Sequence, residues 1–162
     1  MKNKFIFLML LFFFNPSFSQ QQKGNYPQIG KPCPGFVFSD VQYYQKSKVS
    51  LADFKNQWLI LDFWNRYCGV CLGKFQATDS LQKKFSNQVR IMLVGYTGSQ
   101  YTHHSDDKPI RELYEKLRVR LHIDLSIAYD SVLFHQFEIG ACPYIVIVDP
   151  SGVVRSITTG VK

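Results

Sequence analysis

The hydrophobic residues of this chain gather in short continuous runs, separated by longer stretches in which apolar and polar residues alternate at wider spacing. Two of the runs, Trp58–Trp64 and Val89–Gly95, have the length and content of buried strands. Between them, from Cys68 to Phe85, apolar residues recur at steps of three and four, which is typical of an amphipathic helix. The pattern therefore predicts a strand–helix–strand unit in the first half of the chain.

The second half continues with the same alternation of elements. After a polar loop, 96–108, one apolar face predicts a second helix through Leu121, which Asp106 or Asp107 can cap. Three further short elements are expected. They are a strand at 125–128, a short helix at 130–137 that is closed by Gly140, and a strand of β-branched residues at 144–148. Proline and glycine in the turn 149–152 then predict a hairpin to a last strand, 153–159. These elements imply an α/β fold with a mixed central β-sheet flanked by helices.

The first nineteen residues have the pattern of a secretory signal peptide. Lys2 and Lys4 precede an unbroken apolar run, Phe5–Phe14, and small residues at Ser17 and Ser19 predict cleavage before Gln20. The apolar run has half of the roughly 20 residues needed to span a bilayer, so we expect no stable membrane insertion. The predicted organisation is a signal peptide at 1–19, a polar linker at 20–27 and one domain at 28–162, exported to the periplasm or cell envelope.

Charge adds little to this picture. Without Lys2 and Lys4 the chain has 17 basic and 12 acidic residues, and the basic residues are scattered. Nucleic-acid-binding tails carry five or more like charges in a row, so no nucleic-acid partner is expected.

The candidate chemistry lies in Cys68-Gly69-Val70-Cys71. A C-x-x-C pair is compatible with a structural zinc half-site, a chance pair or a redox dithiol. Here it follows a predicted strand and a short polar turn, and it opens the predicted helix. The free N–H groups and the dipole at a helix N-terminus stabilise a thiolate at Cys68, and the thiolate is the form that attacks disulfides. The context favours dithiol–disulfide exchange.

Three stretches together resemble the exported TlpA/ResA type of thioredoxin-like thiol–disulfide oxidoreductase. They are the C-x-x-C after Leu61-Asp62-Phe63-Trp64, the opening Gly30-x-Pro32-x-Pro34-x-Phe36, and Ile139-Gly140-Ala141-Cys142-Pro143 before a β run and Asp149-x-x-Gly152. The resemblance covers about residues 28–160. It implies a thioredoxin fold with an extra strand–helix insertion between central strands. The fold's usual C-terminal helix is apparently missing, so either the chain is a fragment or one sheet face is partly bare.

The resemblance also implies roles for single residues. Cys68 would be the exposed nucleophile and Cys71 the resolving cysteine, together forming the redox-active disulfide. Asp62 would be a buried acid that accepts the proton of Cys71, although a structural role for a strand-end acid is the alternative. Pro143 would be cis, and Tyr67, Cys142 and Pro143 would contact the substrate, with the backbone of Cys142 available for pairing.

The implied activity is exchange of disulfides with cysteine-containing proteins, in envelope disulfide reduction or cytochrome maturation. A membrane or exported thiol reductant would recycle the dithiol, and no cofactor or metal is implied. One alternative is copper or zinc handling by Cys68, Cys71 and Cys142, with His135 or the pair His103-His104. A less favoured alternative is a thiol peroxidase, because peroxidases place Thr or Ser where this chain has Asn65.

Several positions depart from the family pattern or stay open. Gly69-Val70 replaces the common Gly-Pro dipeptide, and Lys74 replaces an acidic residue. Cys142 stands where Thr or Val is usual, so it is either a third active thiol or an inert filler. Cys33 is interpreted as a substitute for alanine at the surface of the core.

Overall fold

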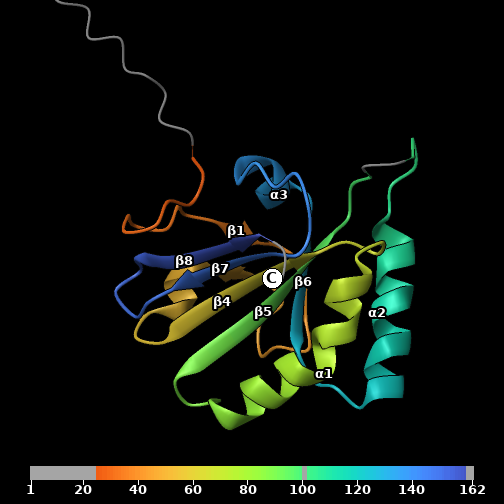
Figure 1. Cartoon of the computed structure of the whole chain (residues 1–162), viewed down its shortest axis with the longest axis horizontal. Helices are drawn as coiled ribbons and strands as arrows, with labels where there is room; N and C mark the ends of the chain where they lie inside the picture. Colours follow the sequence, from red (N-terminus) through yellow and green to blue (C-terminus); the bar gives the residue numbers. More distant parts are fainter. Residues whose placement is uncertain (1–24, 100–101, 160–162) are drawn as a thin grey trace, which may run out of the picture.

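The computed structural model describes residues 25–99 and 102–159, so the predicted signal peptide and most of the polar linker lie outside the described residues. The described chain builds one mixed six-stranded sheet in the order β2-β6-β5-β4-β7-β8 (Figure 1). Its strands are β2 (Val41–Gln42), β4 (Trp58–Trp64), β5 (Val89–Tyr96), β6 (Ser126–Asp130), β7 (Tyr144–Val148) and β8 (Val154–Thr159). The predicted α/β fold with a mixed sheet is confirmed.

Strand β4 lies in the middle of the sheet. It pairs in parallel with β5, where Asp62 lies opposite Leu93, and antiparallel with β7, where Asp62 lies opposite Ile145. Strands β7 and β8 form the predicted hairpin. Strand β6, with helix α2 before it, supplies the extra strand–helix piece between β5 and β7 and pairs with the far edge of β5.

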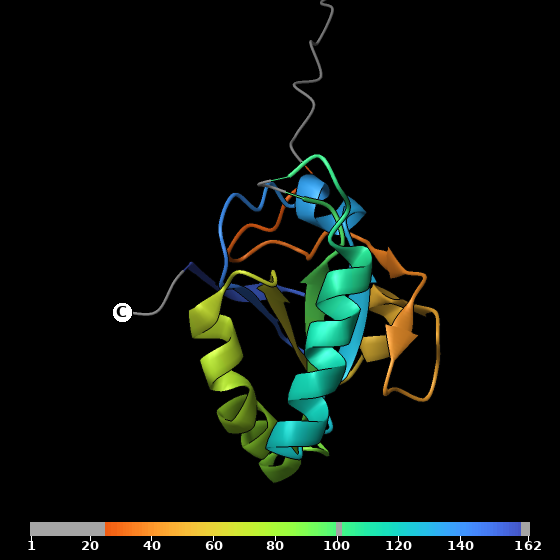
Figure 2. The same cartoon turned by 90° about the vertical axis from the view of Figure 1, so that its right-hand side faces the viewer.

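Helices α1 (Gly69–Lys84) and α2 (Asp107–Leu121) cover one face of the sheet and lie side by side (Figure 2). Side chains of both helices pack there around Trp64, whose ring meets Phe75 of α1 edge-on at 5.2 Å between centroids. A completely buried aromatic residue of this size contributes several kcal/mol to folding. Trp64 thereby fixes the start of α1 against the end of β4.

The opposite face is covered by the N-terminal segment and a short helix. This segment contains β1 (Val37–Phe38), β3 (Val49–Ser50) and the 3-10 helix η1 (Leu51–Phe54), and the short helix is α3 (Val132–Gln136). Phe38, Phe54 and Phe134 pack here against the inward residues of β4, which include Leu61 and Phe63. This face is therefore covered, and it is not the partly bare sheet face that was expected from the sequence.

On the α1 side, β4 and β7 are less completely covered. Ile60, Ile145 and Ile147 alternate with the buried residues of the other face, so they point toward the α1 side, and each is only half-buried. No helix follows β8 within the described residues. Among the described helices, none is long and apolar enough to cross a membrane.

Two local predictions are wrong in detail. Asp106 stands just before α2, but its side chain makes no capping hydrogen bond and pairs instead with Arg66. Helix α3 ends at Gln136 with Phe137 as its C-cap, and the chain turns at Glu138, which has a left-handed backbone with φ of 54°, and not at Gly140. In both places a local pattern gave way to a contact or conformation set by the surrounding fold.

Candidate functional site

The two cysteines of the C-x-x-C motif lie where β4 ends and α1 begins. Cys68 is the N-cap residue of α1, and its sulfur is bonded to that of Cys71 at 2.06 Å. The backbone N–H of Cys71 also points at the Cys68 sulfur, at 3.2 Å. A free N–H and the positive end of the helix dipole thus face Cys68, as thiolate stabilisation requires.

The turn before Cys68 is shaped by Asn65. Its side-chain oxygen accepts a hydrogen bond from the N–H of Tyr67 at 3.0 Å, and its carbonyl accepts one from the N–H of Cys68 at 3.1 Å. Asparagine favours such turns because its short amide side chain substitutes for backbone partners. Asn65 is buried, so these bonds hold the turn in a sheltered environment and fix where Cys68 begins the helix.

The disulfide is less exposed than the resemblance implied. Cys68 is 8% exposed and Cys71 4%, so the description of Cys68 as an exposed nucleophile is wrong in degree. Cys68 is nevertheless the more accessible of the two. The exposed side chains next to it are Tyr67 and Val70, at 45% and 53%. An attacking partner that reaches the Cys68 sulfur therefore has the exposed side chains of Tyr67 and Val70 as neighbours.

Pro143 follows a cis peptide bond, as the resemblance implied. It precedes β7, whose first residue, Tyr144, lies opposite Phe63 near the end of β4. Cys142 packs against the cluster that contains Cys68, Cys71 and Trp64, as well as against the cluster on the opposite face. The structure thus brings the two sequence landmarks to the same end of the sheet.

Cys142 is a free and half-buried thiol. Burial, and to a lesser degree the charge of Asp62, raises the pKa of Cys142 to about 12. A thiol with this pKa is almost entirely protonated near neutral pH and is a poor nucleophile. This environment favours the interpretation of Cys142 as an inert filler over a third reactive thiol.

Asp62 lies two residues before Trp64, the last residue of β4, and its side chain is on the face of the sheet that carries α1. Burial raises the pKa of Asp62 to about 6, and the positive charge of Lys74 opposes this rise. Its carboxyl group makes no hydrogen bond or ion pair with the described residues, although its backbone pairs in the sheet. A carboxyl group with a pKa near neutrality can accept and release a proton under physiological conditions, which is the property expected of a proton acceptor for Cys71.

The raised pKa of Asp62 predicts a specific dependence of stability on pH. Below about pH 4 Asp62 is protonated in both the folded and the unfolded chain, and its burial costs least. Between about pH 4 and 6 the unfolded chain ionises while the folded chain stays protonated, so stability falls over this range and levels off above pH 6. A rise of about two pKa units corresponds to about 3 kcal/mol. Urea unfolding of the oxidised protein from pH 4 to 8 should show Asp62→Asn gaining about this much relative to the parent.

The control for this measurement is Glu112→Gln, which changes an exposed acid on α2. Its stability difference from the parent should stay nearly constant over the same pH range. A parallel pH dependence in Asp62→Asn and the parent would show that Asp62 does not carry the titration.

Candidate metal ligands are not gathered at the site. Among the described residues, no group of three or more His, Cys, Asp or Glu side chains is arranged to hold a metal ion. His103 and His104 are exposed in the loop after β5, and His135 stacks edge-on with Tyr96. The structure therefore adds no observation in favour of copper or zinc handling.

A cavity of about 570 Å³ lies away from the dithiol, at the other end of the sheet. Its lining includes Phe36, Phe54, Leu59 and Val148, together with the free and buried Cys33. Leu59 pairs with Val148 at the end of β4 opposite Cys68. Burial raises the pKa of Cys33 to about 12, so this thiol is unreactive, in agreement with its interpretation as a core residue.

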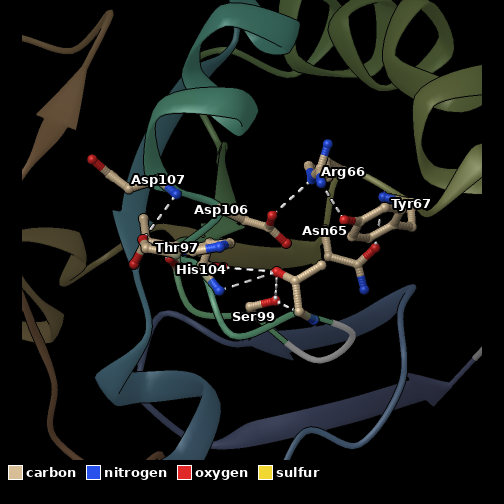
Figure 3. Close-up of polar contacts among 10 residues, drawn as sticks. Asn65, Arg66, Tyr67, Thr97, Ser99, His104, Asp106 and Asp107 are labelled. Carbon is tan, nitrogen blue, oxygen red and sulfur yellow. Dashed lines mark hydrogen bonds and ion pairs between the residues drawn. The ribbon is translucent and has the colours of Figure 1, made fainter.

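Arg66 and Asp106 form a pair near the dithiol that was not predicted from the sequence. The Nε of Arg66 donates to Asp106 at 2.8 Å, across forty residues of chain (Figure 3). Arg66 precedes Tyr67 and Cys68, and Asp106 ends the loop after β5. No local pattern couples these two positions, and only a prediction of which loops meet at this edge of the sheet would have found them.

Comparison with known proteins agrees with this geometry. Residues 29–157 match the AhpC/TSA family. The thioredoxin-like protein YneN of Bacillus subtilis is 23% identical over 133 residues, which are 82% of this chain and 72% of YneN. The thiol-disulfide oxidoreductase ResA of Bacillus cereus is 31% identical over 71 residues, which are 44% of this chain and 38% of ResA, well under two thirds of its length.

Solved structures show the same fold. The thioredoxin domain of a thiol-disulfide oxidoreductase from Bacteroides vulgatus superposes with a TM-score of 0.62 at 18% identity. The superposition covers 82% of this chain and 90% of that domain.

Proposed function

This chain belongs to the AhpC/TSA family and is a thioredoxin-like thiol–disulfide oxidoreductase, and on that basis we propose that it is exported and exchanges disulfides with protein cysteines through Cys68 and Cys71. The observation that carries the proposal is the Cys68–Cys71 disulfide at the N-terminus of α1, at the end of the sheet where cis-Pro143 leads into β7. The helix N-terminus favours a thiolate, and the two sulfurs are already within bonding distance for resolution.

In the reducing direction the reaction has two steps. The Cys68 thiolate attacks one sulfur of a client disulfide, forms a mixed disulfide and releases the other client sulfur as a thiolate. Cys71 then attacks the Cys68 sulfur, which forms the Cys68–Cys71 disulfide and releases the second client thiolate. Asp62 accepts the proton that Cys71 loses in this step. The client is reduced, the protein is oxidised, and a thiol reductant in the membrane or outside it returns the dithiol.

The proposed client-binding residues are Tyr67, Cys142 and Pro143. Tyr67 flanks Cys68 on the exposed side, and Cys142 and Pro143 lead into β7 at the same end of the sheet. An extended client segment that lies along Cys142 would have its cysteine next to Cys68. Backbone pairing of this kind accepts many sequences, which suits an enzyme with several protein clients.

The proposed location is the periplasm or cell envelope, with residues 1–19 as a signal peptide, 20–27 as a linker and 28–162 as the exported domain. The basic and apolar pattern of the first nineteen residues supports export. Envelope disulfide reduction and cytochrome maturation are the proposed pathways, since both require reduced cysteines in an oxidising compartment.

The test of the proposed function is a glutathione redox titration of the purified domain, read by mass mapping of Cys68 and Cys71. A reversible two-electron transition at this pair supports the proposal. A reduction potential of about −270 mV indicates a reductant, and one of about −120 mV indicates an oxidant. Repeating the titration with equimolar copper or zinc tests the metal alternative. No reversible transition, or one abolished by stoichiometric metal, would refute exchange as the main activity.

Cys142→Val should change the rate of exchange less than tenfold, or by less than about 1.4 kcal/mol in the barrier, because the raised pKa keeps this half-buried thiol protonated. Mass mapping after mild oxidation should find mainly the Cys68–Cys71 bridge. Cys33→Ser, which changes the other free cysteine far from the dithiol, is the control. A Cys68–Cys142 bridge as a major product would establish Cys142 as a reactive third thiol.

A further inference from the structure

Arg66, two residues before Cys68, is a charged residue that the exchange reaction does not use. Its guanidinium lies between the carboxylate of Asp106 and the ring of Tyr67 (Figure 3). We propose that Arg66, held by Asp106, is a positioning residue that presents the ring of Tyr67 to clients, and that this selects protein clients with an apolar side chain next to the reacting cysteine. This inference rests on the proposed function and adds a specificity to it.

Asp106 is a rigid anchor for Arg66. Its side chain is 5% exposed, whereas that of Arg66 is 32% exposed. A buried carboxylate is costly to leave without a charge partner, so the Arg66–Asp106 pair is expected to stay formed. Arg66 is therefore held at its inner end by Asp106, while its outer end lies at the surface.

The loop that carries Asp106 is itself fixed. The N–H of Asp106 donates to the carbonyl of Gly98 at 3.2 Å, and the hydroxyl of Ser105 donates to the carbonyl of Thr97 at 2.7 Å. The carbonyl of Asp106 accepts from the N–H of Ile110 in the first turn of α2 at 2.9 Å. Asp106 is thus tied both to the end of β5 and to α2, so its position is set by the body of the fold.

At its outer end Arg66 contacts Tyr67 in two ways. The guanidinium carbon lies 4.3 Å from the centre of the Tyr67 ring, and Nη2 donates to the Tyr67 hydroxyl. A guanidinium that lies over the face of an aromatic ring is attracted electrostatically by the ring. Together the two contacts restrict the rotamers of a side chain that is 45% exposed and directly precedes Cys68.

A restricted ring binds more tightly than a mobile one because less rotamer entropy is lost on contact. The other exposed neighbour of the dithiol is Val70, which is also apolar. A client that buries an apolar side chain against these two residues gains contact area, and one with a polar side chain there does not. This contrast is the basis of the proposed selection.

The test uses two synthetic peptides with an intramolecular disulfide, identical except for Leu or Ser next to the attacked cysteine. For the parent we expect a higher kcat/KM for the Leu peptide than for the Ser peptide. Arg66→Gln and Asp106→Asn should each lower this ratio about tenfold, mainly through a higher KM for the Leu peptide. The double variant should lower it no further, because the two residues act as one unit.

Arg155→Gln is the matched control. Arg155 donates through Nε to the buried Asp149 at 2.6 Å, in the β7–β8 hairpin at the opposite end of the sheet. This pair resembles the Arg66–Asp106 pair, but it is remote from Cys68. Arg155→Gln should retain the parental ratio, whereas Arg66→Lys, which keeps the charge but loses the planar stack, should fall between Arg66→Gln and the parent.

An unchanged ratio in Arg66→Gln would overturn the inference, and so would an equal fall with both peptides, which indicates damage to the fold. A parent enzyme that reduces both peptides equally well would also refute the proposed selection. If the parent reduces neither peptide, the proposed function itself fails, and this outcome is distinguishable from the others.

Discussion

Cys68→Ser will abolish disulfide exchange, whereas Cys71→Ser will accumulate mixed disulfides between Cys68 and its clients. The difference follows from the place of each sulfur. Cys68 caps α1 and is the more accessible of the two, while Cys71 lies in the first helical turn and is 4% exposed. Without Cys71 the first attack still occurs, but nothing resolves its product. Non-reducing gels of envelope extracts, followed by mass spectrometry of the adducts, measure both effects.

The double variant Cys68→Ser/Cys71→Ser should capture no clients and serves as the control. Alkylation of the reduced parent at graded pH should also modify Cys68 before Cys71. Adducts formed on Cys71 in the Cys68→Ser variant, at a rate similar to those on Cys68, would reverse the assignment of attacking and resolving cysteine.

The second large effect is expected from Asp62→Asn, which should slow resolution of the mixed disulfide by about 100-fold near neutral pH. Positioned acid–base groups contribute about 10²–10⁴-fold to the rate of such steps. Asp62 is suited to this role because burial raises its pKa to about 6. Formation of the mixed disulfide involves Cys68, which the helix N-terminus already favours as a thiolate, so this step should change little.

Stopped-flow measurements can separate the two steps. The Cys71→Ser background reports formation alone, so formation is compared between Cys71→Ser and Cys71→Ser/Asp62→Asn. Resolution is then measured in the variants that retain Cys71. Equal slowing of both steps would reduce Asp62 to a structural residue, in line with the alternative for a strand-end acid. No change in either step would have the same consequence.

The elements nearest the dithiol were the most predictable part of this fold. The apolar run 58–64 is β4 without correction, and the spacing after Cys68 marked α1 to within one residue at each end. Both predictions succeeded because the hydrophobic pattern of these two segments marks residues, such as Leu61 and Phe75, that the fold buries. The two landmarks at Cys68 and Pro143 meet because β7 pairs with β4.

The parts that failed depend on contacts between distant segments. Strand β2 has only two residues, Val41 and Gln42, and it exists because it pairs with β6 more than 80 residues later. Asp106 stands at a position typical of a helix cap, but its side chain pairs with Arg66 instead. A sequence pattern reports the preference of a segment in isolation, and these segments are decided by their neighbours.

The position of β4 between β5 and β7 also means that substitutions in this strand and substitutions in the neighbouring C-x-x-C dipeptide have different costs to folding. Strand β4 is paired on both edges and its Leu61 and Phe63 face is buried, whereas Gly69 and Val70, between the two sulfurs, are exposed. Substitutions in this dipeptide can therefore alter the chemistry of the disulfide with little cost to folding. The Gly69-Val70 dipeptide can therefore vary, in evolution or by design, while β4 stays unchanged.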